Sequence, residues 1–110
     1  MKYLITESQI KNLVDKFLEK ESKKWVVYDI EDGEFTIWYN NVNKIISYRI
    51  SYDDEHVYGK YVFDYLFYDR IKSLFGLNMD KTAEYIVDFL NKEFNTNVKY
   101  NDWDFIEEEI

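Results

Sequence analysis

The stretch Ile45–Tyr52, which reads IISYRISY, decides the fold class of this chain. Large apolar and aromatic side chains occupy its even positions, and polar side chains occupy the odd positions from 47 to 51. Because neighbouring side chains on a strand point to opposite faces of a sheet, this alternation predicts a half-buried strand. One face of that strand should carry Ile46, Tyr48, Ile50 and Tyr52, and the other face should carry Ser47, Arg49 and Ser51.

The same period extends to both sides of this strand. WVVYDI (25–30) and EFTIWYN (34–40) are separated by EDG, and Asp32-Gly33 is typical of a hairpin turn. NNVN forms the next turn, DDE forms the third, and HVYGKYVF (56–63) is a fourth strand. Because short turns join each strand to the next, the sequence predicts a four-stranded antiparallel meander.

Helical periods flank the strands. Thr6 as N-cap and Gln9 form a capping box, and Ile5 and Ile10 sit at the positions of a hydrophobic staple, which predicts a helix over residues 7–22. Two further helices follow the strands. Gly76 is placed to end the first of them in the left-handed conformation, and Asn78 or Asp80 can cap the second. The apolar stripes at helical spacing are Ile10, Leu13, Val14, Phe17 and Leu18, then Leu66, Phe67, Ile71, Leu74 and Phe75, then Ala83, Ile86, Val87, Leu90 and Phe94.

The fold class is therefore α+β, in a single domain over residues 1–110. An N-terminal helix, the antiparallel meander and two C-terminal helices make up its order. Val98-Lys99-Tyr100 can form a short last strand, and an acidic tail of about residues 101–110 follows as a frayed helix or a disordered end. Four strands make a sheet about 19 Å wide, and helices pack about 8–10 Å apart. We expect the first helix and one C-terminal helix on one face, with the other on an edge, on the helices or on the second face.

Composition excludes several classes of function. The chain has 110 residues with no Cys, no Pro and a formal net charge of -8. The absence of Cys excludes disulfides, thiolate metal sites and Cys nucleophiles, and it fits a reducing cytosol. The acidic balance should repel phosphate backbones and attract basic partners, so we expect no direct nucleic-acid binding. No apolar stretch approaches the length of a membrane span, so we expect no membrane association.

Motifs of catalysis and metal binding are missing from the sequence. His56 is the one histidine, and it follows Asp53, Asp54 and Glu55 in what we interpret as a plain turn rather than a metal site. The acidic group in residues 29–34 lacks the spacing of an EF-hand loop, and no phosphate-binding glycine motif or G-x-S-x-G occurs. An enzyme would need a pocket where His56, a carboxylate and a tyrosine converge. We expect no catalytic residue, no metal, no cofactor and no enzymatic activity.

The second face of the predicted sheet is the first candidate site. A core face of Val26, Tyr28, Phe35, Ile37, Ile46, Tyr48, Ile50, Tyr61 and Phe63 leaves Trp25, Val27, Trp38, Arg49, Tyr58, Lys60 and Val62 on the other face. Because Trp, Tyr and Arg are enriched at binding hot spots, the candidate protein-binding residues are Trp25, Trp38, Arg49, Tyr58 and Lys60. Two readings stay open: a partner or self-association surface, and aromatic residues that reflect strand propensity or lie under the remaining helix.

The chain's last ten residues, NDWDFIEEEI, are the second candidate. They hold five acids and no base. Acidic ends of this kind are typically solvated. The alternative is an arm for a basic partner surface, with Trp103 and Phe105 as apolar anchors.

The opening MKYLITESQ, residues 1–9, resembles the start of many small uncharacterised proteins of tailed bacteriophages. Some of these similarly continue with a helix, short aromatic strands and a helical half with an F-x-L-like break, matched here by Phe75-Gly76-Leu77. The resemblance implies a phage or phage-like origin and a place in the host bacterial cytoplasm or in a virion, and it implies no activity.

From these features we expect a small acidic non-enzymatic protein that acts by protein–protein interaction. Within that function, it could inhibit or modulate a host system, because acidic chains of this size can engage basic surfaces by charge complementarity. The partner is then a basic protein or a second copy of the chain. The alternative is a structural or assembly component that forms a homo-oligomer or part of a virion.

Overall fold

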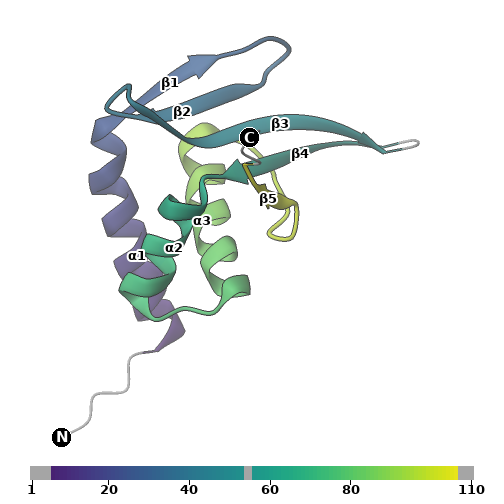
Figure 1. Ribbon diagram of the computed structural model, residues 1–110. Helices are drawn as coiled ribbons and strands as arrows, with labels where there is room; N and C mark the ends of the chain where they lie inside the picture. The colour runs from purple at the N-terminus through teal and green to yellow at the C-terminus, as the bar shows by residue number, and fades with distance from the viewer. Residues whose placement is uncertain (1–5, 54–55, 107–110) are drawn as a thin grey trace, which may run out of the picture.

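The computed structural model describes residues 6–53 and 56–106 (Figure 1). It has the predicted α+β class, with an N-terminal helix, grouped strands and two later helices. The elements are α1 (Glu7–Glu21), the 3-10 turn η1 (Ser22–Lys24), β1 (Trp25–Asp29), β2 (Phe35–Tyr39), β3 (Asn43–Asp53), β4 (His56–Phe63), α2 (Tyr65–Phe75), α3 (Met79–Phe94) and β5 (Trp103–Phe105).

Local capping chemistry sets the helix ends. The Gln9 backbone N–H donates to Thr6 Oγ1 at 3.3 Å and the Thr6 backbone N–H donates to Gln9 Oε1 at 2.8 Å, which confirms the capping box. Gly76 ends α2 with a φ of 62°, and the Asn78 side chain caps α3 by accepting from the Lys81 N–H. The staple expected between Ile5 and Ile10 involves a residue outside the described ranges.

The sheet has the order β1-β2-β3-β4-β5. The first four strands form the predicted antiparallel meander, and β5 joins β4 in parallel. The last strand is therefore Trp103–Phe105, and the expectation of a strand at Val98–Tyr100 is wrong. The Asn91 side chain engages both backbone groups of Val98, at 2.9 and 3.0 Å, so these groups do not enter a ladder. The start of the expected acidic tail is thus part of the sheet, and residues 107–110 lie outside the described ranges.

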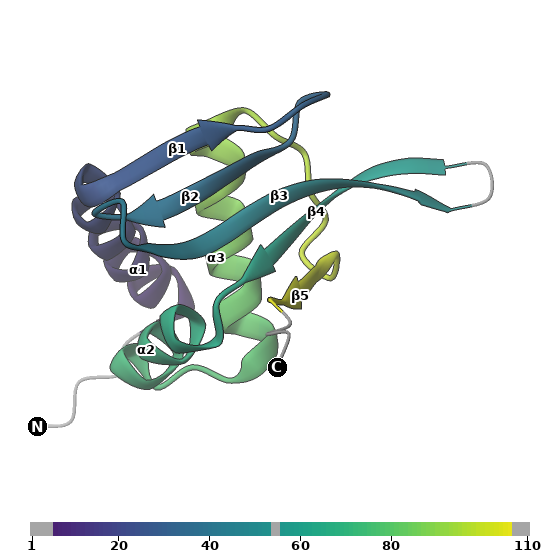
Figure 2. The same cartoon turned by 45° about the horizontal axis from the view of Figure 1, so that its top comes forward.

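All three helices lie on the same side of the sheet (Figures 1 and 2). Each of them contacts the other two. Of the three positions expected for the remaining helix, α2 takes the one against the other helices, at one end of the sheet. There Phe67 contacts Trp25 of β1 with ring centroids 6.2 Å apart, and Tyr68 stacks on Trp103 of β5 at 5.3 Å.

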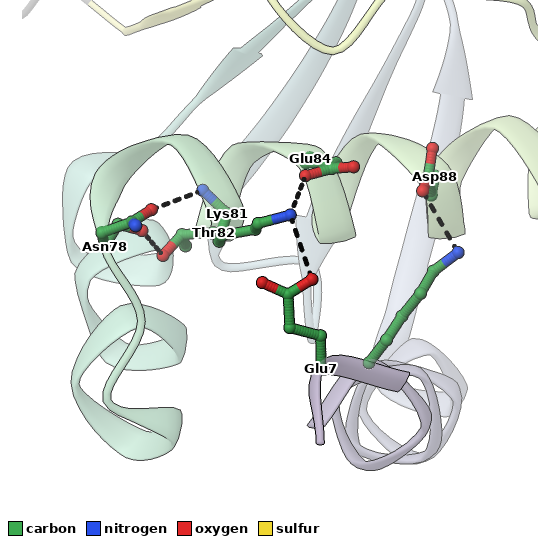
Figure 3. A network of polar contacts seen from close by, with 7 residues as sticks. Glu7, Asn78, Lys81, Thr82, Glu84 and Asp88 are labelled. Atoms are coloured by element: carbon green, nitrogen blue, oxygen red, sulfur yellow. Dashed lines mark hydrogen bonds and ion pairs between the residues drawn. The ribbon is translucent and has the colours of Figure 1, made fainter. Parts of the chain in front are cut away.

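Partly exposed charged side chains link α1 to α3 (Figure 3). Lys81 Nζ lies 3.7 Å from a Glu7 carboxylate oxygen and 3.2 Å from one of Glu84, and Lys11 pairs with Asp88 at 3.2 Å. Exposed pairs of this kind contribute about 0–1 kcal/mol each. The helices are therefore held mainly by the apolar core, whose fully buried members include Val14, Leu18, Ile37, Ile46, Tyr61, Phe63, Ile71, Ile86 and Leu90.

The orientation of β1 differs from the prediction. Val27 lies opposite Ile37, so Trp25 and Val27 face the helices, whereas Val26 and Tyr28 face away. The cause is the length of the β1–β2 loop. Asp29 lies opposite Phe35 and the Ile30 N–H donates to the Glu34 carbonyl, which leaves three residues, 31–33, in the loop. With three residues in the loop, an odd-numbered residue of β1 lies opposite an odd-numbered residue of β2, and an even-numbered residue opposite an even-numbered one. The predicted core face combined even-numbered residues of β1 with odd-numbered residues of β2, so its assignment of β1 was wrong.

Candidate functional site

The sheet face turned away from the helices carries the candidate site. No helix within the described ranges covers it (Figure 2). We call it the open face, and it presents Val26, Tyr28, Thr36, Trp38, Lys44, Ser47, Arg49, Ser51, Tyr58, Lys60, Val62 and Asp104. Antiparallel sheets commonly leave one face in contact with water, so the accessibility of the open face is ordinary. The open face is distinguished by its residue types.

A bulge shapes the centre of this face. The register between β2 and β3 shifts at Ile37/Trp38, so Ile37 lies opposite Ile46 while Trp38 lies opposite Lys44. The extra residue is Ile45, which is buried and accepts a 2.7 Å hydrogen bond from the Asp64 N–H. The shift moves Lys44 onto the open face, beside the other cationic side chains.

An aromatic pair occupies one end of the open face. Tyr28 meets Trp38 edge to face, with ring centroids 6.3 Å apart and an interplanar angle of 87°. Trp38 Nε1–H donates to Thr36 Oγ1 at 3.1 Å, and the Tyr28 hydroxyl donates to Asn41 Oδ1. These four residues line a shallow hollow of about 340 Å³. Each aromatic ring is therefore held in place while part of its surface stays accessible.

A hollow lined with cations lies beside this pair. It has a volume of about 300 Å³ and is lined by Lys44, Ser47, Arg49, Lys60, Val62, Asp104, Phe105 and Ile106; we call it the basic hollow. Arg49 lies directly opposite Lys60 across the β3–β4 ladder. Lys60 Nζ lies 3.4 Å from Asp104 Oδ2, whereas no carboxylate of the described residues pairs with Arg49. The hollow therefore places three positive side chains around one negative one.

The structure brings together four of the residues singled out by sequence. Trp38, Arg49, Tyr58 and Lys60 share the open face. Trp25 does not, because its ring packs in the core against Phe67 and Phe89. Placing Trp25 on the second face was therefore wrong.

The expected tail anchors also lie elsewhere. Trp103 and Phe105 lie opposite Tyr61 and Phe63 and so face the helices. Their rings contact Tyr68 with centroids 5.3 and 5.0 Å apart, respectively. The strand that carries them is paired to β4 by backbone hydrogen bonds, so both aromatic side chains belong to the core of this fold.

Tyr28 and Lys44 are among the open-face residues that sequence reasoning missed. The signal for Tyr28 was present, because a three-residue loop places it on the same face as Thr36 and Trp38. The sequence held no such signal for Lys44, because the face on which Lys44 lies depends on the bulge at Ile45.

The β3–β4 hairpin extends beyond the rest of the sheet (Figure 2). Pairing with β2 stops at Tyr48 and pairing with β5 starts at Tyr61, so residues 49–53 and 56–60 form a two-stranded arm. Tyr52 and Val57 on this arm are 79% and 64% exposed. Glu34 Oε2 accepts a 2.8 Å hydrogen bond from the Ile50 N–H, which occupies one backbone donor on an edge of the arm.

A third hollow, of about 540 Å³, lies beneath the arm. It is lined by Tyr48, Ile50, His56, Val57, Tyr58, Gly59, Asn97, Lys99 and Asp102. It thus holds the three residue types that an enzyme would need. Acid–base catalysis requires its groups within about 2.6–3.2 Å of the atoms they serve, and no hydrogen bond in the described part of the chain joins His56 to Asp102 or Tyr48.

Residues 6–53 and 56–106 contain no group of three or more acidic or histidine side chains that could hold a metal ion. Nor does any helix in these ranges have the length and apolarity needed to cross a bilayer.

Comparisons with known proteins assign no family to the chain. No family model, no curated protein and no solved structure matches it. The candidate site is therefore defined by the geometry of the open face alone.

Proposed function

We propose that this chain is a non-enzymatic binding protein that contacts a partner protein through the open face. One observation carries the proposal. Trp38, with Tyr28 at one side and Arg49 in the neighbouring strand, keeps part of its surface accessible on a sheet whose other face carries three helices. Trp, Tyr and Arg are the residue types that most often dominate binding free energy at protein interfaces.

The fixed geometry of these side chains supports the same function. Thr36 holds the Trp38 indole and Asn41 holds the Tyr28 hydroxyl, so little side-chain freedom would be lost on binding. The rings also project from paired strands rather than from loops, which keeps the surface in one shape. A surface of this kind favours binding over catalysis.

We place the protein, by the resemblance of its opening residues, among phage or phage-like proteins that act in the host bacterial cytoplasm. In that setting, binding a host protein would inhibit or modulate the process in which the host protein takes part.

A capture experiment tests the binding function. The tagged full-length chain would be used to recover partners from a bacterial lysate, beside a Trp38→Ser/Tyr58→Ser variant. Tyr100→Ser/Leu74→Ser is the matched control, because these two side chains are 62% and 57% exposed and lie off the open face. We expect a defined partner with the wild type and the control and none with the open-face variant, all three being folded by circular dichroism. Equal capture by all three forms would refute the proposal.

An assembly component is the second candidate, and the arm favours it. Exposed Tyr52 and Val57 on a two-stranded projection suit contact between copies of the chain. Light scattering of the purified chain and of a Tyr52→Ser/Val57→Ser variant tests this function. A fixed oligomer that dissociates in the variant would support it, and a monomeric wild type would exclude it.

A further inference from the structure

We infer that the open face takes an acidic segment of its partner, whose carboxylates sit in the basic hollow. This inference rests on the proposed function, because it names the chemistry of a partner that binds the open face. This inference differs from the expectation from sequence that the acidic chain binds a basic partner. The difference arises from how charge is distributed over the surface.

The charge on the open face is opposite to that of the whole chain. The chain carries a formal net charge of -8, yet the charged side chains around the hollow are Lys44, Arg49 and Lys60 against Asp104. Ser47 in the hollow is only 2% exposed, so the concave surface is bordered by cations and floored by a small side chain. A concave site with walls of one sign concentrates ions of the opposite sign.

Arg49 and Lys60 place two positive charges directly opposite each other in the sheet. Like charges directly opposite each other on neighbouring strands are destabilising. Asp104 balances Lys60 at 3.4 Å, whereas Arg49 has no carboxylate partner among the described residues. A carboxylate placed between the two cations would turn their repulsion into two charge-assisted hydrogen bonds, and the Arg49 guanidinium can bind it with two N–H groups.

A protein segment fits this site better than a nucleic acid does. Binding a phosphate backbone calls for a stripe or large patch of cations, and the overall charge of -8 would repel a long polyanion. The basic hollow offers three cations in about 300 Å³, a size suited to one or two carboxylate side chains. The adjoining Tyr28–Trp38 pair offers a surface for an apolar side chain of the same segment.

Fluorescence anisotropy with fluorescein-labelled hexaglutamate tests the inference. We expect the full-length chain to bind this probe, with affinity that falls as salt is added. An Arg49→Gln/Lys60→Gln variant should bind about tenfold more weakly or worse, the equivalent of about 1.4 kcal/mol. The control is Lys16→Gln/Lys20→Gln, which removes the same charge from exposed positions on α1 and should bind as the wild type does.

The chain itself supplies a second source of carboxylates. Ile106 lines the basic hollow, and the sequence continues with Glu107-Glu108-Glu109. A Glu107→Gln/Glu108→Gln/Glu109→Gln variant is therefore titrated beside the wild type. Binding by either form that depends on Arg49 and Lys60 supports the inference. Failure of both forms to bind, binding that survives Arg49→Gln/Lys60→Gln, or tighter binding of an oligothymidine of equal charge would overturn it.

The two experiments separate the inference from the proposed function. A partner captured through Trp38 and Tyr58, without binding of hexaglutamate, leaves the binding function in place and removes its acidic chemistry. Binding of hexaglutamate in the basic hollow, without any partner captured through the open face, would leave the acidic-ligand chemistry in place and remove the proposed binding function.

Discussion

The ring of Tyr48 occupies the space that a side chain at Gly59 would need. A Cβ built on Gly59 would lie 2.6 Å from Tyr48 Oη and 2.8 Å from Cε2 of the same ring. Ile50 is the residue directly opposite Gly59, so Tyr48 reaches it diagonally across the β3–β4 ladder. The ring also stacks on Phe35 with centroids 5.1 Å apart and contacts Tyr61 at 5.3 Å. The base of the arm is therefore closely packed on a glycine.

Gly59→Ala should destabilise the fold, because Tyr48 is held by Phe35 and Tyr61 and cannot yield without a shift of the strand. We expect the free energy of unfolding to fall by about 1–3 kcal/mol, as is typical of overpacking. Urea denaturation followed by circular dichroism measures this change.

Tyr48→Phe is the matched control for that prediction, since it removes only the atom nearest to the new methyl group. In a Tyr48→Phe background, Gly59→Ala should cost less than it does in the wild type. An equal cost in both backgrounds would show that the Tyr48 hydroxyl is not the cause and that the ring carbons carry the clash.

The two tryptophans of the first hairpin should differ sharply in their effect on stability. Trp25→Ala empties a site between Phe67 and Phe89, and we expect a loss of about 3 kcal/mol, as for other large aromatic side chains removed from cores. Trp38→Ala on the open face should cost less than about 1 kcal/mol. Chemical denaturation of both variants measures the two losses in the free energy of unfolding. The reverse order would mean that Trp25 faces the solvent, as the sequence pattern first indicated.

Parts of the fold set by local chemistry were predictable from sequence. Thr6 with Gln9, Gly76, and Asn78 each satisfy backbone groups within a few residues, and the helix ends follow from them. The alternation in Ile45–Tyr52 depends only on side chains of one strand, so the orientation of β3 was also correct. Arg49, Tyr58 and Lys60 were placed on the open face for the same reason.

Features that depend on distant pairing were not predictable in this way. β5 comes from an acidic segment, and its Trp103 becomes a core residue only by meeting Phe63 and Tyr68. Lys44 reaches the basic hollow through a bulge that no local pattern marks. The face of Trp25 is a different case, because the odd length of the β1–β2 loop already determined it.

Asp15 should limit stability at neutral pH. Its Oδ1 is buried without a hydrogen-bond partner among the described residues. Burial is the main cause that raises the pKa of this carboxyl above 3.8; Lys11 and Lys92 act against it, and Asp88 and Glu19 add to it. The charged form is therefore disfavoured in the folded state. Asp15→Asn should raise the free energy of unfolding at pH 7, by about 0.5–1 kcal/mol.

The pH dependence of that gain gives the check. A raised folded-state pKa means that the cost of Asp15 is full above that pKa and vanishes below the unfolded value of 3.8. The advantage of Asp15→Asn should accordingly shrink as urea denaturation is repeated at falling pH. Glu93→Gln, at an exposed position on α3 and not among the charges that shift the pKa of Asp15, should give no such gain. A gain that is equal at pH 7 and pH 3 would contradict the explanation.

Two buried tyrosines should make the fold sensitive to alkali. The Tyr68 hydroxyl donates to the Met79 carbonyl at 2.7 Å, and burial raises the pKa of Tyr68 to about 12. Tyr61 shares a 2.6 Å hydrogen bond with Thr96, and burial raises the pKa of Tyr61 further still. In the unfolded chain both groups ionise near 10. The folded state therefore retains protons that the unfolded state releases, and stability present below pH 10 should be lost progressively as pH rises toward 12.

Tyr68→Phe isolates the contribution of one of these groups. The variant loses the hydrogen bond to Met79 and should be less stable than the wild type at pH 8, but its stability should fall less steeply between pH 10 and about 12, because one of the two ionisations is gone. Urea midpoints measured across this range give the two slopes. Tyr100→Phe is the control, since Tyr100 is 62% exposed and its removal should leave the slope as it was. Identical slopes for wild type and Tyr68→Phe would show that Tyr68 ionises in the folded state as readily as in the unfolded chain.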